Sequence, residues 1–162
     1  MKTIYTILCS LMVLCLTMDA QAQSVKSKQY DKWIQGKPTE EAQEIKRMLF
    51  ETVPKWYADK NTSQQLWEGT VLSVDMTWDA LDQLKANSNQ SLLNKVQIIK
   101  ILWTPASKEM LDPSYFTLFP HLKYVIISFY EDYKYEQVEK LLDSSMYNQP
   151  YEIVLMRLNN PK

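Results

Sequence analysis

The sequence predicts an α/β fold in which short strand-and-helix units follow one another along the chain. The stretch 121–130, HLKYVIISFY, is apolar at both sets of alternating positions, as is typical of a strand buried on two faces. Similar runs lie at 70–76, 96–103 and 151–158, and the later runs repeat at intervals of about 27 residues. Segments with helical patterns separate them, so the four runs predict four roughly parallel strands.

The first 22 residues have the three parts of a secretory signal peptide. Lys2 gives the positive start, residues 4–18 are almost wholly apolar, and Ala20-Gln21-Ala22 forms a cleavage site. This ending resembles signal peptides common in Bacteroidetes-type bacteria. The apolar run is short for a membrane span. We therefore expect export to the periplasm or the extracellular space, with cleavage before Gln23 and no membrane span afterwards.

Composition limits the kind of protein that follows the signal peptide. Both cysteines, Cys9 and Cys15, lie inside the apolar run, so the exported domain must be stabilised by its hydrophobic core instead of disulfides. The whole chain has 18 basic and 19 acidic residues without a long block of one sign, which argues against a nucleic-acid partner. The predicted organisation is a signal peptide at 1–22, a flexible N-terminal arm at 23–37 and a single globular domain at 38–162.

A capping helix is predicted at the start of the globular domain. Thr39 follows a proline as a candidate N-cap, two glutamates suit the first turn, and apolar residues recur at helical spacing until about Thr52. Pro54 then ends the helix. Its apolar stripe is expected to cover the open side of the first repeat strand. Between this helix and the first repeat strand, aromatic residues surround a polar loop at 59–65.

The remaining elements follow from periodicity and from proline. Apolar and polar side chains alternate along residues 70–76, so this strand has one partly polar face, which suits an edge strand. A short amphipathic helix is predicted at residues 78–86. Residues 107–118 are predicted to form a short helix or helical turns that break at Pro113. The segment 133–143 has the clearest helical pattern among the repeats.

The strand runs resemble leucine-rich repeats over roughly residues 70–160. The apolar spacing of the family is matched by Val71-x-x-Val74-x-Met76, Val96-x-x-Ile99-x-Ile101, Leu122-x-x-Val125-x-Ile127 and Tyr151-x-x-Val154-x-Met156. In leucine-rich repeats an asparagine follows the strand. Only the last unit has this asparagine, at Asn159; the corresponding position holds Asp79, Thr104 and Tyr130 in the other three units. The resemblance implies a curved array of parallel strands.

Two other architectures fit the same pattern. A compact three-layer α/β domain, with helices on both faces of one twisted sheet, explains strands that are apolar on both sides. In an α+β domain the periodicity is a coincidence.

Few residues suit catalysis. His121 is the only histidine, so a histidine-rich metal site is excluded and any serine triad must use it; a structural histidine at a strand start is the simpler interpretation. The chain has two glycines, Gly36 and Gly69, which excludes a glycine-rich phosphate-binding loop. We therefore predict a protein that is not an enzyme and uses no cofactor and no metal.

Carboxylates support an alternative function. Glu131 and Asp132 follow the third strand, at the edge where open parallel sheets bind ligands, and Asp75 and Asp79 flank the matching end of the first strand. Paired acids at this edge would suit a carboxylate-dependent hydrolase or a carbohydrate-binding domain. Acids after strands are also common helix caps, and Asp132 could cap a helix that starts near Tyr133.

The leading hypothesis is a non-enzymatic exported module that recognises a protein or peptide through exposed strand faces. Tyr124 and Tyr130 share a face with Ile126 and Ser128. If another layer covers that face, the tyrosines belong to the core; if it is open, they form an aromatic binding surface. The candidate binding residues are Asp75, Gln97, Lys100, Tyr124, Tyr130 and Glu131.

Overall fold

In a computed structural model of the chain, residues 27–86 and 90–160 are described. The signal peptide expected at 1–22, and the first residues of the expected arm, lie outside them. Within the described residues, none of the helices combines the length and the hydropathy needed to cross a membrane.

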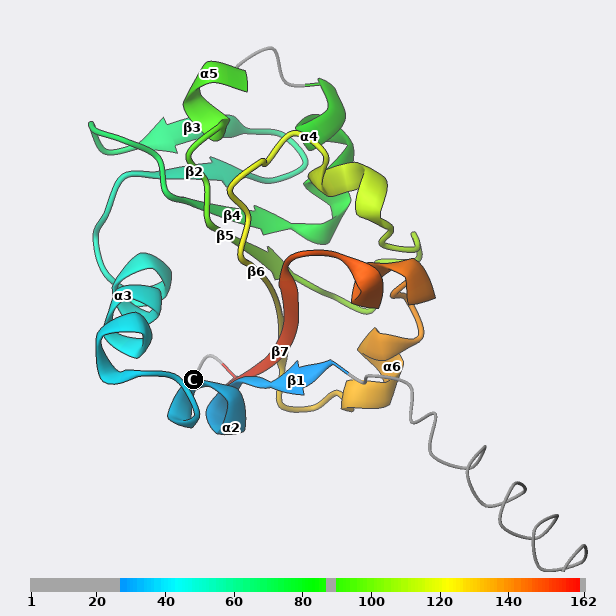
Figure 1. Cartoon of the computed structure of the whole chain (residues 1–162). Helices are drawn as coiled ribbons and strands as arrows, with labels where there is room; N and C mark the ends of the chain where they lie inside the picture. Colours follow the sequence, from blue (N-terminus) through cyan, green and yellow to red (C-terminus); the bar gives the residue numbers. More distant parts are fainter. Residues whose placement is uncertain (1–26, 87–89, 161–162) are drawn as a thin grey trace, which may run out of the picture.

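The centre of the fold is a seven-stranded sheet in the order β1-β7-β6-β5-β4-β2-β3 (Figure 1). All neighbours are parallel except β2 and β3, which form an antiparallel hairpin at one edge. The predicted α/β class is thus confirmed, and the four predicted strands, β4 to β7, lie side by side in sequence order. The strands are β1 (Lys28–Gln29), β2 (Lys55–Ala58), β3 (Ser63–Leu66), β4 (Ser73–Thr77), β5 (Ile98–Leu102), β6 (Tyr124–Tyr130) and β7 (Glu152–Leu158).

Helices cover both faces of the sheet (Figure 1). One face, here called the crossover face, packs against the segments that connect β4 to β7. The other, here called the cap face, packs against the two N-terminal helices. The helices are α2 (Tyr30–Gln35), α3 (Thr39–Phe50), α4 (Leu81–Ala86), α5 (Gln90–Leu93) and α6 (Tyr135–Glu139), with 3-10 turns at Trp78–Ala80, Pro113–Phe116 and Ser144–Asn148.

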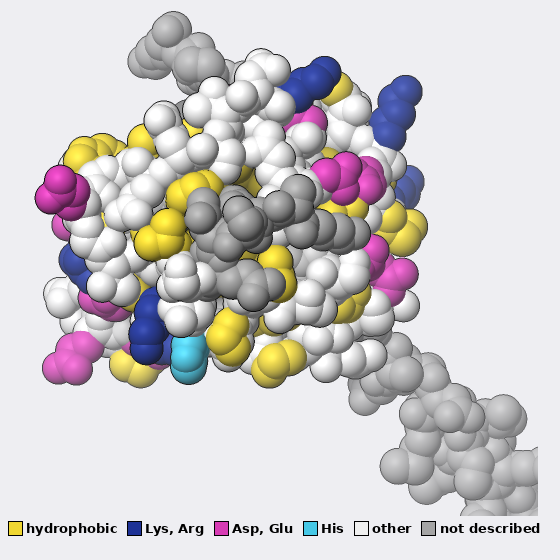
Figure 2. Space-filling view, turned by 90° about the horizontal axis from the view of Figure 1, so that it is seen from above, with side chains coloured by type: hydrophobic (Ala, Val, Ile, Leu, Met, Phe, Trp, Pro, Cys, Tyr) yellow, Lys and Arg dark blue, Asp and Glu magenta, His cyan; other side chains and the backbone are white. Residues whose placement is uncertain are grey.

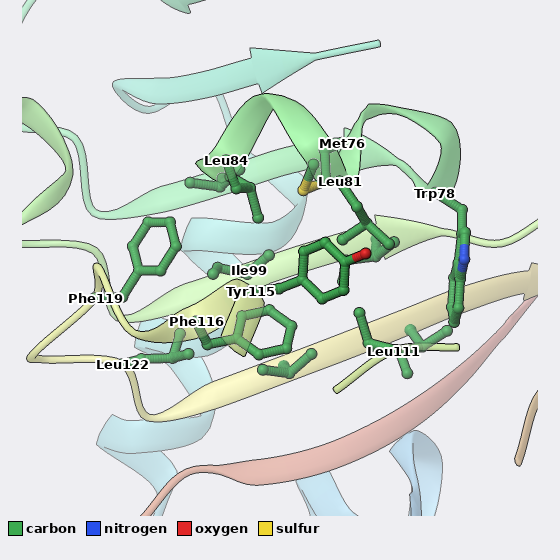
Figure 3. Close-up of a cluster of buried hydrophobic side chains, with 14 of the residues drawn as sticks. Met76, Trp78, Leu81, Leu84, Ile99, Leu111, Tyr115, Phe116, Phe119 and Leu122 are labelled. Atoms are coloured by element: carbon green, nitrogen blue, oxygen red, sulfur yellow. The ribbon is translucent and has the colours of Figure 1, made fainter. Parts of the chain in front are cut away.

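The larger core lies on the crossover face. Strand residues such as Met76 and Ile99 pack there against aromatic and leucine side chains from the connections (Figure 3). Trp78 is buried among them and its indole Nε1 donates a hydrogen bond to the backbone oxygen of Glu109 at 3.1 Å. Phe116 stacks edge-on against Tyr151, with ring centroids 5.4 Å apart. This core joins the connections to the sheet.

The smaller core lies on the cap face. Ile45 and Leu49 of α3, together with Trp33 of α2, pack over Ile98 and Ile126 of the sheet. Strand β6 is therefore buried on both faces along six of its seven residues. This explains why its sequence is apolar on both faces except at Ser128, a buried residue whose hydroxyl donates to the backbone oxygen of Ile101.

The edges of the sheet differ from the sequence-based expectation. Strand β4 is internal, because the β2–β3 hairpin pairs beyond it. Its polar residue Asp75 is accommodated there by ion pairs with Lys55 and Lys100, which lie on the neighbouring strands. The capping helix α3 accordingly covers a face of the sheet instead of the first repeat strand. At the other edge, residues 28–35 of the expected flexible arm form β1 and α2, and β1 pairs with β7.

The helices between the strands are shorter than the periodicity predicts. Pro113 begins the 3-10 turn instead of breaking a helix, since a first helical position does not need the missing N–H. The side chain of Asp112 accepts the backbone N–H of Ser114 at 2.7 Å and so caps this turn. The predicted helix at 133–143 is reduced to the five residues of α6.

The strand registers match three of the four sequence repeats. Val74 is aligned with Ile99, and Ile99 with Val125, as the apolar spacing predicts. In β7, however, the aligned residue is Ile153 and not Val154. Residues 153–156 are all buried, so alternation in the sequence could not fix the register of this strand.

Because β6 is buried on both faces, truncating a side chain on either face should cause a similar loss of stability. Ile126→Ala, on the cap face, and Ile127→Ala, on the crossover face, should each lower the free energy of unfolding by about 2–5 kcal/mol, because both remove a fully buried side chain. Leu92→Ala, at a side chain that is 40% exposed, serves as the control and should change it much less. Urea denaturation of the three variants measures this. An Ile126→Ala loss no larger than that of the control would show that α2 and α3 do not cover the sheet.

Candidate functional site

Four of the six candidate binding residues lie on the cap face. Alternation within the strands places Asp75, Lys100, Tyr124 and Tyr130 there, on three adjacent strands. Gln97 precedes β5 at the opposite end of the strands from Tyr130, and Glu131 follows β6. The structure thus brings the first four together on one face and leaves the other two at separate edges of the sheet.

A charged row crosses the cap face. Tyr57, Asp75 and Lys100 are direct cross-strand neighbours on β2, β4 and β5. Lys100 Nζ lies 2.9 Å from Asp75 Oδ2, and Lys55 Nζ lies 3.5 Å from the same oxygen. The side chain of Asp75 is 19% exposed and that of Lys100 is 23% exposed, so the row is still accessible from solvent.

Lys55 connects this row to helix α3. The residue is only 5% exposed, and its Nζ donates to the backbone oxygen of Met48 at 3.3 Å. Ser73 Oγ donates to the same carbonyl at 3.4 Å. Carbonyls in the last turn of a helix lack partners within the helix and carry partial negative charge, so a lysine is well placed there. These contacts fix the end of α3 over β2 and β4.

The other oxygen of Asp75, Oδ1, is buried and has no hydrogen-bond partner among the described residues. An unpaired acceptor of this kind costs free energy, of order 1–3 kcal/mol, unless a donor reaches it. The two ion pairs thus engage one oxygen of Asp75 and leave the other without a partner among the described residues.

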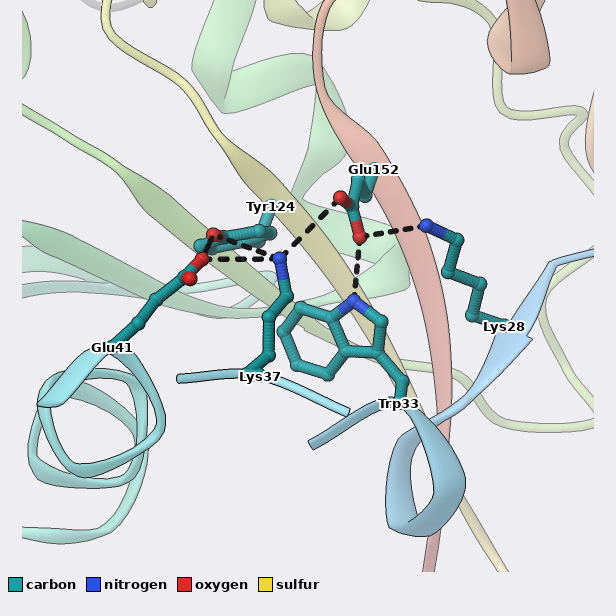
Figure 4. Close-up of polar contacts among 6 residues, drawn as sticks. All are labelled: Lys28, Trp33, Lys37, Glu41, Tyr124 and Glu152. Carbon is teal, nitrogen blue, oxygen red and sulfur yellow. Dashed lines mark hydrogen bonds and ion pairs between the residues drawn. The ribbon is translucent and has the colours of Figure 1, made fainter. Parts of the chain in front are cut away.

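Tyr124 belongs to the core and to a polar network at the start of β6 (Figure 4). It is 7% exposed, and its hydroxyl donates to Glu41 of α3 and accepts from Lys37. Lys37 Nζ also contacts Glu152 Oε1 at 3.4 Å and lies 4.8 Å from the centre of the Tyr124 ring. Glu152 in turn accepts from Trp33 Nε1 at 2.5 Å. The network joins both N-terminal helices to β6 and β7.

The network shifts the pKa values of its members. Hydrogen bonds from Tyr124 and Lys37 lower the pKa of Glu41. Burial opposes ionisation of Glu152, but bonds from Trp33 and Lys28 and the charge of Lys37 outweigh it, so its pKa is also lowered. Burial and the bond to Glu41 raise the pKa of Tyr124. Both carboxylates are thus held in the charged form that the network needs.

The helices do not cover the whole cap face. Towards the C-terminal ends of the strands, several half-buried residues share this face without belonging to either buried core. Thr77 is paired in register with Leu102, one step beyond the Asp75–Lys100 pair, and Tyr130 lies at the end of β6. We call this surface the open half-face; it consists of Tyr57, Thr77, Lys100, Leu102 and Tyr130.

The carboxylates expected at the C-terminal edge are held by structural contacts. Glu131 Oε1 accepts the backbone N–H of Asn160 at 3.3 Å, and Asp132 Oδ2 accepts from its side-chain amide at 2.7 Å. Asp79 accepts from the Thr77 hydroxyl at 2.5 Å. Asp132 does not cap α6, whose N-cap is Lys134. Glu131 and Asp132 therefore connect the end of β6 to the end of β7, whereas Asp79 makes only a local contact at the end of β4.

Gln97 and His121 lie at the N-terminal edge of the sheet. Both line a hollow of about 480 Å³ in front of β4, β5 and β6. The histidine side chain is exposed. Over the described ranges, 27–86 and 90–160, no three His, Cys, Asp or Glu residues are grouped so that they could hold a metal ion.

Sequence reasoning missed several residues of these surfaces. The sequence places Lys37 in the expected flexible arm, Glu41 in the first turn of the predicted helix and Leu102 in a strand expected to be buried. Lys37 and Glu152 are 115 positions apart in sequence, so no local pattern connects them. Comparisons with protein-family models, with curated proteins and with solved structures found no match.

The lowered pKa values predict how acid affects the docking of the N-terminal helices. Glu41 and Glu152 have folded-state pKa values below those of the unfolded chain. Their contribution to stability is therefore complete above the unfolded values and is lost as the pH falls through the folded ones. The Glu152→Gln variant should be less stable than the wild type at neutral pH. Its melting temperature should fall less than that of the wild type between pH 7 and pH 3.

Glu68→Gln, at an exposed loop position, is the matched control for this substitution. Thermal melts across the pH series measure the difference. If the Glu152→Gln curve ran parallel to that of the wild type throughout, the network would not be the acid-sensitive contact.

Proposed function

We propose that the chain is an exported, non-enzymatic module that binds a protein or peptide on the open half-face. The observation that supports this is the incomplete cover of the cap face: α2 and α3 bury the side of the face around β6 and β7, while Leu102 and Tyr130 remain half-buried outside both cores. Aromatic and apolar side chains next to polar ones are the usual composition of an interface centre.

The order of the strands supports the interpretation that this surface is built from repeated strand units. From β4 to β7 each strand pairs with the next one in the sequence, and their connections pack on one face. The apolar repeat positions Val74, Ile99 and Val125 point to that face, and the intervening positions point to the cap face. We infer a short array similar to leucine-rich repeats, in which the intervening positions contact the partner.

The charged row would fix the orientation of the partner. Lys100 Nζ is paired with Asp75, but part of its side chain is exposed and an ammonium has three protons to donate. Asp75 Oδ1, in contrast, is buried and does not face the partner. A peptide backbone presents carbonyl oxygens, so it could accept from Lys100 while its side chains pack on Leu102 and Tyr130.

Mixed surface charge is consistent with this kind of partner. Figure 2 shows acidic and basic side chains dispersed around one side of the molecule, with small apolar areas between them. The alternative, a carboxylate-dependent hydrolase or carbohydrate-binding domain, receives less support, because Glu131 and Asp132 are both bonded to Asn160.

Peptide selection tests the proposed surface. Peptides selected from a random display library on the folded domain, residues 23–162, should lose about tenfold or more in affinity on Tyr130→Ala and on Lys100→Ala, since each substitution removes a central contact. Lys60→Ala, at an exposed position after β2, is the control and should bind normally. Fluorescence anisotropy measures the affinities, and melting curves confirm that each variant is folded.

Retained affinity in both folded variants would contradict this site. So would selected peptides whose affinity falls equally with the Lys60→Ala control.

Export is testable separately from binding. When the full chain is expressed in a bacterium with a secretion pathway, mass spectrometry of the periplasmic fraction should find a mature N-terminus at Gln23, because Ala20-Gln21-Ala22 matches the cleavage pattern. Ala22→Lys should block processing and leave the precursor in the cell. Only uncleaved chain in the cytoplasm of the wild-type strain would contradict export.

A further inference from the structure

The hollow at the N-terminal edge of the sheet is separate from the open half-face. It has a volume of about 480 Å³, within the range of small-molecule sites, which is about 300–1,000 Å³. Its lining comes from the segments directly before β4, β5 and β6. Because these strands are parallel, the open half-face lies towards their other end.

The lining of this hollow is basic. Lys95, His121 and Lys123 contribute to it, and no Asp or Glu does. Glu44 of α3 lies within the influence of Lys123: the hydrogen bond from Arg47 lowers the pKa of Glu44, and the charges of Arg47 and Lys123 lower it further. Glu44 is already paired with Arg47, at 2.7 Å, so it neutralises the hollow only partly.

Backbone hydrogen bonds hold the three lining segments together. The backbone oxygen of Gln97 accepts from the N–H groups of Lys123, at 2.9 Å, and Tyr124, at 3.1 Å. The N–H of Gln97 donates to the oxygen of Leu72 at 2.8 Å. These bonds set the segments before β5 and β6 side by side, so the lysine stems start from fixed positions.

The hollow is lined by both polar and apolar side chains. Gln97 adds an amide that can donate hydrogen bonds beside the lysines. Leu72 is half-buried and Leu122 is buried, and both line the same space. The hollow therefore offers positive charge together with an apolar surface.

We propose that this hollow binds a small organic anion with two or more negative charges, such as a phosphate monoester or a di- or tricarboxylate. The two lysines would pair with the anionic groups, Gln97 would donate to one of their oxygens, and the leucines would contact the carbon skeleton. This site does not depend on the proposed peptide surface, whose residues lie towards the other end of the strands.

Titration of the folded domain with phenyl phosphate, inorganic phosphate, citrate and benzyl alcohol tests this site. Isothermal calorimetry gives the affinity, and the imidazole proton signals of His121, the only histidine, report whether binding occurs in the hollow. Phenyl phosphate or citrate should bind saturably, and phenyl phosphate should bind more tightly than inorganic phosphate because of the leucine surface. Preference between phenyl phosphate and citrate identifies the anionic group.

A charge-matched pair of variants separates a site from general attraction. Lys95→Gln/Lys123→Gln should weaken binding by about tenfold or more, as expected when hydrogen bonds to charged groups are lost. Lys46→Gln/Lys60→Gln removes two exposed lysines outside the lining and should leave affinity unchanged. Glu44→Gln should strengthen binding, since it removes the competing carboxylate.

Equal weakening in the two double variants would overturn the site, because it would indicate attraction by net charge alone. The absence of saturable binding by phenyl phosphate and citrate in the millimolar range would also overturn it. Binding of benzyl alcohol as tight as that of phenyl phosphate would show an apolar site instead of an anion site.

Discussion

Burial of β6 on both faces is the constraint on which the rest of the fold depends. Six of its seven residues are buried, and each large side chain of this kind contributes about 1.5–3 kcal/mol when removed from water. The connections after β4 supply a cover for one face only. The other cover has to come from elsewhere in the chain, and α2 and α3 provide it from the N-terminal side. The N-terminal segment is therefore part of the core.

The polar residues of the cap face determine where that cover ends. Apolar residues on β6 and β7 accept Trp33 and Ile45, whereas β2, β4 and β5 carry Lys55, Asp75 and Lys100 in the same region. Burial of a lysine is unfavourable unless its charge is paired, and Lys55 finds both Asp75 and a carbonyl at the end of α3. Extending the cover beyond this point would bury Lys100, whose side chain is 23% exposed, with Asp75 as its one charged partner among the described residues. The open half-face follows from this limit.

Much of the fold is encoded in patterns that can be recognised locally. The apolar run of β6, the helical spacing of α3 and the repeat interval predict the class and the four central strands. The β2–β3 hairpin was missed because β2 has only four residues and the sequence of β3, Ser-Gln-Gln-Leu, is mostly polar. The position of β4 was mistaken because a partly polar face usually marks an edge, and here cross-strand ion pairs replace exposure to water.

The candidate surfaces were harder to predict, because they depend on which strand faces are covered. Tyr124 and Tyr130 lie on the same face of the same strand, yet the first is a core residue that bonds to α3 and the second is half-buried outside both cores. Alternation identifies the shared face, but only the position of α3 separates the two roles. That position depends on contacts such as Lys37 with Glu152, which no local sequence pattern contains.

The polarity of the sheet explains why two different surfaces can exist on one small domain. Six strands run in the same direction, so the residues before strands collect at one edge and the residues after strands at the other. The first group includes Lys95 and Lys123, and the second includes Asp79 and Glu131. The residues that line the hollow and those of the open half-face therefore lie towards opposite ends of the strands. An anion at the first and a peptide at the second would contact separate residues, and either could be lost without the other.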